Sequence, residues 1–229
     1  MKYIICKRIY MAMSLIFIVC IGYTATTNTS DTAPRLNTKN IGLLVVATGN
    51  YKNFIPQLLD SARKYFCTTH KVTFFIFSDS FTSQAIDTVI IPIQKLASHY
   101  DSALRSLHYI NSANLYKNMD YIFACDADTA FVDVVGDEIL GDLTLVQNTN
   151  GSFNKRFFGC NIVNFLALCD NIARNVEQRI LLATVDKNCE DECFNNTVSL
   201  LQPTRILPPA YYAPQNTCPY RIHARSCVK

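Results

Sequence analysis

The sequence contains no tryptophan, few charged residues and few histidines. Charged residues make up 17% of the 229 positions, and the formal net charge is only +3. Lysine and arginine do not gather into a dense patch interleaved with aromatic residues, so we expect no nucleic-acid partner. The four histidines form no cluster, and no Ser–His–Asp order, Walker loop or GxGxxG motif stands out. The familiar hydrolase and phosphate-loop signatures are therefore missing.

Apolar residues are abundant instead. They make up 49% of the chain, which is enough to build a large core. The length suits one α/β domain with a terminal segment.

The terminal segment has the pattern of a membrane-targeting sequence. Lys2, Lys7 and Arg8 precede an apolar run over residues 9–23, and a polar stretch follows. We expect residues 1–8 to be a cytoplasmic tail, residues 9–23 a signal-anchor transmembrane segment, residues 24–40 a stem and residues 41–229 a lumenal domain. The alternative is a signal peptide that is cleaved near Ala25, which would give a secreted protein.

Ten cysteines and three sequons agree with a lumenal location. Cys6 and Cys20 lie in the targeting segment, and the other eight are an even number, which permits disulfides. The late Cys189-x3-Cys193 spacing also resembles a zinc motif, but no histidine lies near that pair, so disulfides or free core thiols are favoured. Sequons at Asn28, Asn150 and Asn195 are possible glycosylation sites.

Apolar runs alternate with helical spacings in the first half of the domain. Continuous apolar runs predict buried strands, and apolar residues three and four apart predict helices. Strands are expected at residues 41–47, 72–77, 88–93 and 121–125, and helices at residues 54–66 and 102–116. This alternation predicts an α/β fold with a mostly parallel, Rossmann-like sheet and ligands beyond the carboxyl ends of the strands.

The second half is less regular. We expect strands at residues 143–147 and 204–207, a tight apolar turn at residues 157–159, and helices at residues 163–184 and 190–201. Pro208 and Pro209 end the last strand.

A pair of carboxylates follows the predicted strand at residues 121–125. Asp126 and Asp128 are separated by one small residue, Ala127. Two rigidly held carboxylates can share Mg²⁺ or Mn²⁺, which bind oxygen ligands and complete their shell with phosphates. Such a cation would neutralise a leaving diphosphate. The plain alternative is a solvated turn.

Three segments resemble one known family, in the correct order. NMDYIFACDADTAFVDVVGDEILGD, residues 118–142, resembles the donor-site segment of glycosyltransferase family 6, which includes the blood-group A and B transferases and the α-1,3-galactosyltransferases. IGLLVVATGNYKNFIPQLLDSARKYF, residues 41–66, is similar to the family's first strand and helix. EDECFNNTVSLLQPTRILPPAYY, residues 190–212, is similar to its HDESHLN…KPTKILSPEY region.

The resemblance implies a fold, a reaction and a location. The family has a GT-A fold and transfers galactose or N-acetylgalactosamine from a UDP-sugar to a glycan hydroxyl, with retention at the anomeric carbon. The implied cofactor is Mn²⁺ or Mg²⁺. We therefore expect a hexosyltransferase with a glycoprotein or glycolipid acceptor, anchored as a type II protein in the Golgi membrane.

The resemblance also assigns residues on the donor side. Asp126 and Asp128 match the metal-binding pair. Ala47, Thr48 and Tyr51 match positions that contact uridine, where Tyr51 could stack on the base; a helix-start aromatic is the alternative for Tyr51. Arg105 is the nearest match to a donor-binding arginine, although an ordinary helix-surface charge explains it as well.

The reacting centre is assigned to two adjacent carboxylates. Glu192 matches the family's active-site glutamate, which would face the anomeric carbon as a nucleophile or as an electrostatic stabiliser. Asp191 matches a residue that contacts the donor sugar. Without the resemblance, both would be acidic residues at a helix N-terminus, where carboxylates favour the helix dipole.

The chain departs from the family in its acceptor half. Only residues 143–156 replace a segment that is about 30 residues longer in the family and includes a histidine loop for the acceptor. Asn154, Lys155 and Arg156 stand where the family has small residues, and Arg156 could fill the galactose space or bind an acidic group. Three alternatives follow: a transferase with another UDP-hexose donor, a degenerate UDP- or glycan-binding protein, or a gene model that lacks an exon.

Overall fold

The computed structural model describes residues 37–96, 98–186, 188–213 and 220–222. The predicted tail, the signal anchor and most of the stem lie outside the described residues. Within the described ranges, no helix combines the length and the apolar character needed to cross a membrane. All elements below belong to one compact unit, Leu36–Lys229.

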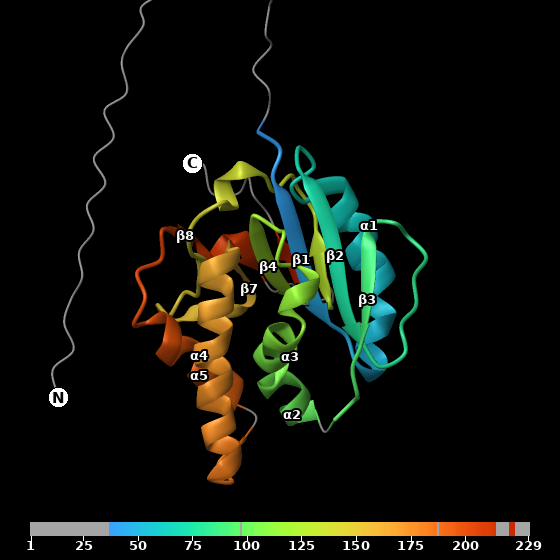
Figure 1. The fold of residues 1–229 in the computed structure, drawn as a ribbon. Helices are drawn as coiled ribbons and strands as arrows, with labels where there is room; N and C mark the ends of the chain where they lie inside the picture. Colours follow the sequence, from blue (N-terminus) through green and yellow to red (C-terminus); the bar gives the residue numbers. More distant parts are fainter. Residues whose placement is uncertain (1–36, 97, 187, 214–219, 223–229) are drawn as a thin grey trace, which may run out of the picture. The chain divides into compact units, whose positions relative to one another are not determined.

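Strands and helices follow one another along most of this unit (Figure 1). The strands are β1 (Asn40–Val46), β2 (Lys71–Ser78), β3 (Thr88–Pro92), β4 (Tyr121–Asp126), β5 (Thr129–Phe131), β6 (Thr144–Gln147), β7 (Phe153–Asn161), β8 (Arg205–Leu207), β9 (Tyr212–Ala213) and β10 (Tyr220–Ile222). The α-helices are α1 (Ile55–Tyr65), α2 (Ser98–Ala103), α3 (Arg105–Asn111), α4 (Ile162–Leu181) and α5 (Cys189–Val198). Short 3₁₀ turns are η1 (Gly49–Phe54), η2 (Ala113–Leu115), η3 (Asp137–Ile139) and η4 (Pro209–Tyr211).

A seven-stranded sheet forms the centre of the unit. Its strand order is β3-β2-β1-β4-β7-β6-β8. The first four strands are mutually parallel, and β7 runs antiparallel to both β4 and β6. A small second sheet, β5-β10-β9, follows the end of β4. Parallel strands at the centre are buried on both faces, which explains why their sequences are continuous apolar runs.

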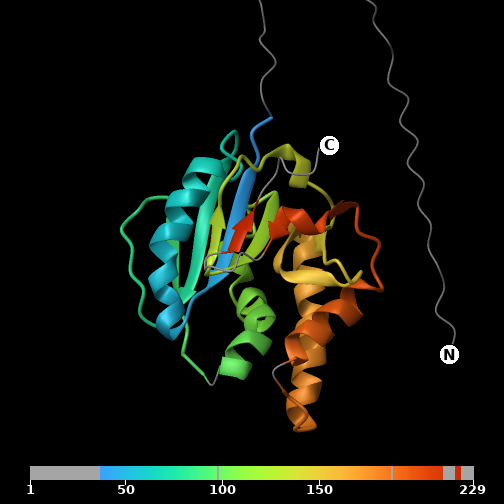
Figure 2. The same ribbon diagram turned by 180° about the vertical axis from the view of Figure 1, so that it is seen from behind.

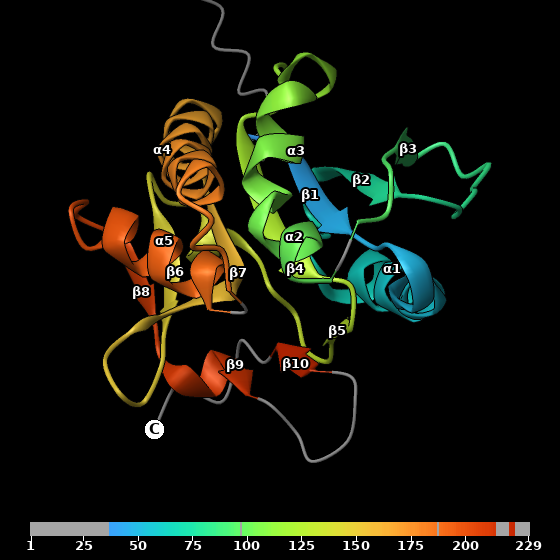
Figure 3. The same cartoon turned by 90° about the horizontal axis from the view of Figure 1, so that it is seen from below.

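Helices cover both faces of the sheet. Leu43 and Val45 of β1 face one core cluster, where α1 contributes its buried residues, and Leu44 faces the other, where α4 and α5 pack. Figures 2 and 3 show α1 on one face and α3, α4 and α5 on the opposite face. The predicted α/β class with a mostly parallel sheet is therefore confirmed.

Two local predictions are corrected by the structure. The helix expected at residues 102–116 is divided into α2, α3 and η2, with breaks at Leu104 and Ser112. The turn expected at residues 157–159 lies within β7. Apolar spacing shows which side chains are buried, but it does not show where the backbone leaves helical geometry.

Gly159 of β7 is needed for close packing, not for a turn. It pairs with Phe123 of β4, and a Cβ at this position would lie only 2.0 Å from Cδ1 of the Phe123 ring. The aromatic ring therefore occupies the space that any larger residue would require. This explains why glycine follows Phe157 and Phe158 inside a strand.

The sheet brings two distant segments to the same edge. Val46, the last residue of β1, is in register with Asp126, the last residue of β4. The turn after β1 and the aspartate at the end of β4 therefore lie at adjacent carboxyl ends, where α/β sheets bind ligands.

Candidate active site

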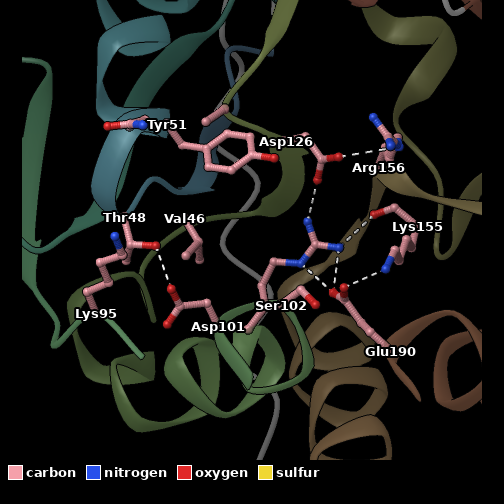
Figure 4. Close-up of a pocket in the computed structure, with 13 residues that line it drawn as sticks. Val46, Thr48, Tyr51, Lys95, Asp101, Ser102, Asp126, Lys155, Arg156 and Glu190 are labelled. Carbon is pink, nitrogen blue, oxygen red and sulfur yellow. Dashed lines mark hydrogen bonds and ion pairs between the residues drawn. The ribbon is translucent and has the colours of Figure 1, made fainter. Parts of the chain in front are cut away.

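A pocket opens at this carboxyl edge of β1 and β4 (Figure 4). Its volume is about 460 Å³, within the range of about 300–1,000 Å³ that small-molecule sites occupy. Its lining comes from the end of β1 and the turn after it (Val46, Thr48, Asn50, Tyr51), from α2, α3 and the residues before them (Lys95, Asp101, Ser102, Arg105), from the end of β4 (Asp126, Ala127), from β7 (Lys155, Arg156) and from α5 (Glu190).

Arg105 is the centre of the charged part of the pocket. Its NH1 donates to Oδ1 of Asp126 at 2.6 Å, and its Nε donates to Oε1 of Glu190 at 2.7 Å. A third bond runs from NH2 to the backbone oxygen of Lys155 at 3.3 Å. Burial by itself would lower the pKa of this guanidinium, but the carboxylates of Glu190 and Asp126 outweigh that effect and raise the pKa well above the ordinary value.

Glu190 is held by two cations. Its Oε1 accepts from Arg105, and its Oε2 accepts from Nζ of Lys155 at 2.6 Å. The Glu190 side chain is only 6% exposed, so these contacts replace the water that a carboxylate would otherwise bind. Lys155 also lies 3.2 Å from Oδ2 of Asp191.

Asp126 faces an arginine on each of its oxygens. Oδ1 accepts from Arg105, and Oδ2 forms an ion pair with Nε of Arg156 at 3.5 Å. Among the described residues, no group of three or more His, Cys, Asp or Glu side chains is placed to hold a metal ion. The arrangement around Asp126 therefore does not fit a divalent cation, because both oxygens already contact guanidinium groups.

The second aspartate of the predicted metal pair is placed differently. Asp128 lies in the turn between β4 and β5, and the residue is 9% exposed. It is not part of the pocket lining, which includes Asp126 and Ala127. Its predicted role as a metal ligand stays a prediction.

The predicted uridine contacts lie at the other end of the pocket. Thr48 lines it and donates from Oγ1 to Oδ2 of Asp101 at 2.9 Å. Tyr51 lines it with 56% of the residue exposed, so its ring is accessible to a ligand. Ala47 is fully buried in the core and does not form part of the lining. The structure thus brings Thr48, Tyr51, Arg105 and Asp126 together from three separate segments.

Helix α5 turns Glu190 into the pocket and Glu192 away from it. Oε2 of Glu192 pairs with NH1 of Arg179 on α4 at 2.7 Å, and its side chain is 50% exposed. Positions two apart on a helix point in nearly opposite directions, so Glu190 and Glu192 do not face the same cavity. Asp191 is exposed and contacts the pocket only through Lys155. The catalytic role assigned to Glu192 stays a prediction.

Sequence reasoning missed Glu190 and Lys155 as site residues. A signal for Glu190 was present, because it lies on the same helical face as Cys193, Phe194 and Thr197, all of which are buried. A carboxylate on that face must point inward. Lys155 was noted only as a departure from small residues, and nothing in the sequence links it to Glu190.

Comparisons with known proteins identify the family of the chain. The family model described as Glycosyltransferase family 6 matches residues 18–157, more than half of the chain. The chain belongs to glycosyltransferase family 6. The matched range contains β1, β4 and most of the pocket residues, and the α/β sheet is the one expected for the family's GT-A fold.

Curated members of the family share partial similarity with the chain. It is 33% identical to the globoside alpha-1,3-N-acetylgalactosaminyltransferase 1 of Mus musculus over 115 residues, which covers 45% of this chain and 33% of the relative. The Gallus gallus protein of the same name is 29% identical over 126 residues, covering 50% of this chain and 36% of the relative. The histo-blood group ABO system transferase 2 of Rattus norvegicus is 28% identical over 119 residues, covering 48% of this chain and 36% of the relative. The chain thus matches about a third of the length of these relatives.

Proposed function

We propose that this chain transfers a hexose, galactose or N-acetylgalactosamine, from a UDP-sugar to a hydroxyl of a glycan, with retention at the anomeric carbon. The observation that carries the proposal is the convergence of Thr48, Tyr51, Arg105 and Asp126 on one cavity at the carboxyl edge of the sheet. Family membership supports it, as do the names of the globoside relatives, which specify N-acetylgalactosamine.

The pocket has separate regions for the parts of such a donor. Tyr51 offers an exposed ring on which uracil could stack, beside Thr48. Arg105, Lys155 and Arg156 place cations where a diphosphate would lie. In the reaction the bond from the anomeric carbon to the diphosphate oxygen breaks, and its electron pair stays on UDP. The acceptor oxygen then bonds to that carbon, and its proton passes to the phosphate oxygen of the departing UDP. Fixed cations stabilise the charge that develops on UDP.

Two glutamates of α5 are candidates for the carboxylate next to the anomeric carbon. The family resemblance assigns Glu192, which would have to leave Arg179 and turn toward the cavity. The pocket contains Glu190, which is held by Arg105 and Lys155. The geometry supports Glu190, because it is the glutamate of α5 that lines the pocket.

The proposed cofactor and location follow from patterns in the sequence. Mn²⁺ or Mg²⁺ follows from the Asp126 and Asp128 pattern, but the arginines at Asp126 oppose it. A type II Golgi membrane protein, with residues 41–229 as the lumenal catalytic domain, follows from the targeting pattern, whose residues lie outside the described ranges. Protease protection of the full chain in isolated microsomes would test that topology.

A second candidate is a UDP- or glycan-binding protein without turnover. The internal ion pairs favour it, since Asp126 and Glu190 are already neutralised by cations in the resting site. A third is a transferase with another UDP-hexose, because Arg156 narrows the side of the pocket where the family has small residues.

A donor panel separates these possibilities. The full chain is incubated with UDP-galactose, UDP-N-acetylgalactosamine, UDP-glucose or UDP-N-acetylglucosamine and oligosaccharide acceptors, and released UDP is measured. We expect release with galactose or N-acetylgalactosamine donors and none from Asp126→Asn, because Asp126 lines the pocket between Arg105 and Arg156. Turnover only with UDP-glucose or UDP-N-acetylglucosamine would support the third candidate, a transferase with another UDP-hexose. UDP binding without turnover for any donor would leave only the binding protein.

A further inference from the structure

The position beside Asp126 where a cation would bind is taken by an arginine. Nε of Arg156 lies 3.5 Å from Oδ2 of Asp126, while Arg105 occupies Oδ1. The two arginines differ in accessibility: the side chain of Arg105 is 9% exposed and that of Arg156 is 37% exposed. Arg105 is therefore a buried support for Asp126, and Arg156 is the more accessible of the two arginines.

An irregularity in the pairing of β7 brings Arg156 to the pocket. The pairing of β4 with β7 ends at Cys125 and Phe157, so Lys155 and Arg156 lie beyond the last paired residue of β4. The pairing of β7 with β6 jumps from Phe158 to Asn154 between consecutive β6 residues. Adjacent residues of a regular strand point to opposite faces, but a bulge re-aims them. Both Lys155 and Arg156 consequently line the same cavity.

The charge of the lining suits an anion. Four cations line the cavity, Lys95, Arg105, Lys155 and Arg156, against three anions, Asp101, Asp126 and Glu190, which leaves one positive charge in excess (4 − 3). Arginine binds phosphate through parallel N–H bonds from its planar fork. A contact to phosphate through the terminal nitrogens is compatible with the contact between Nε and Asp126.

We propose that Arg156 takes the place of the divalent cation in this chain: its guanidinium bridges Asp126 and the diphosphate of the nucleotide donor, with Lys155 beside it. This inference rests on the proposed function, because it assumes that the pocket binds a UDP-sugar. It follows that UDP binds without any divalent metal. It also gives Asp126 a new role as a positioning residue for Arg156.

The test measures UDP binding to the full chain by isothermal titration calorimetry, first in EDTA and then with Mn²⁺. We expect the two dissociation constants to agree within about threefold. Arg156→Ala should weaken UDP binding in EDTA by about tenfold or more, and Arg156→Lys should recover part of the loss. Arg174→Ala is the matched control, because Arg174 is a 73% exposed arginine on α4 that pairs only locally, with Asp170. Near-UV circular dichroism confirms that each variant is folded.

The outcomes distinguish this inference from the proposed function. Binding of UDP by the unaltered chain only when Mn²⁺ is present would overturn the inference and keep the transferase proposal. Wild-type affinity of Arg156→Ala in EDTA would also overturn the inference. Absence of UDP binding in both EDTA and Mn²⁺, with the chain folded, would overturn the proposed function itself.

Discussion

Arg105 and Glu190, 85 positions apart in the sequence, form a buried ion pair in which two arginine nitrogens lie 2.6 and 2.7 Å from the same carboxylate oxygen. This pair joins α3 to α5 beneath the pocket. Arg105 simultaneously holds Asp126, so one guanidinium ties the two helices to the end of β4. Arg105, Glu190 and Asp126 therefore hold the tertiary structure together and also line the pocket.

The first prediction concerns stability. Arg105→Met should lower the free energy of unfolding by about 3–5 kcal/mol, because it leaves the buried Glu190 with one partner fewer. The double variant Arg105→Met with Glu190→Met should lose less than the single variant, since it also removes the buried carboxylate that would otherwise keep only Lys155 as its partner. Urea denaturation measures both, with Arg174→Ala expected to change stability by less than about 0.5 kcal/mol. Equal losses in the single and double variants would contradict the account of the ion pair.

The second prediction concerns the two glutamates of α5. Glu190→Gln should lower transfer by about 10²-fold or more, because it removes a charge from the cavity. Glu192→Gln should change transfer by less than about threefold, because Glu192 contacts Arg179 outside the cavity. Initial rates of transfer by the two variants at saturating donor test this prediction. A larger loss of transfer in Glu192→Gln than in Glu190→Gln would show that Glu192 turns inward during the reaction, as the family resemblance assigns.

The third prediction concerns alkaline pH. Six described cysteines, Cys67, Cys125, Cys160, Cys169, Cys189 and Cys193, are buried free thiols. Burial raises the pKa of Cys193 to about 11 from an ordinary 9.0, and burial also raises the pKa of Cys125. In the unfolded chain the thiols of Cys125 and Cys193 lose their protons near pH 9, while in the folded chain they keep them in this range. Each such thiol therefore lowers the stability by up to about 1.4 kcal/mol per pH unit in this window.

The measurement is the free energy of unfolding between pH 8 and pH 11 in a reducing buffer. Stability should fall as pH rises from about 9. In Cys193→Ala the fall between pH 9 and 11 should be smaller than in the unaltered chain. Parallel curves for the two proteins would show that Cys193 does not contribute to the alkaline loss.

The fourth prediction concerns the two described sequons. Asn195 accepts from the backbone N–H of Phe153 at 2.8 Å and donates from Nδ2 to the oxygens of Phe153 and Asp191. Asn150 bonds only within its own turn, to Ser152. In a secretory host we expect a glycan on Asn150 and none on Asn195, because a glycan on Nδ2 of Asn195 would displace β7 from α5. Mass spectrometry of tryptic peptides after glycosidase treatment in H₂¹⁸O reports each site.

Matched variants check the structural part of that argument. Asn195→Gln should cost about 1–2 kcal/mol, because the backbone of Phe153 loses its partners. Asn150→Gln should cost less than about 0.5 kcal/mol, as expected for a surface turn. Occupancy of Asn195 in the folded protein would contradict the contacts at Phe153.

The sequence predicted the parts of the fold that depend on local patterns. The apolar runs became β1, β2, β3 and β4 within one or two residues, and the carboxyl-end rule placed Thr48 and Asp126 at the same edge of the sheet. The break between α2 and α3 was missed, because apolar spacing continues through it. The network of Arg105, Glu190 and Lys155 was missed for another reason: its members are distant in the sequence, and each taken alone is an ordinary surface residue type.

Gly159 affects the width of the pocket although it is not among the residues that line it. The Phe123 ring lies against this glycine, and any side chain there would push apart β4, which ends in Asp126, and β7, which carries Arg156. A larger residue at position 159 would be tolerated only together with a smaller one at position 123. The spacing of Asp126 and Arg156 thus depends on an aromatic contact in the core, so mutations at that contact are expected to reshape the pocket while every polar residue stays the same.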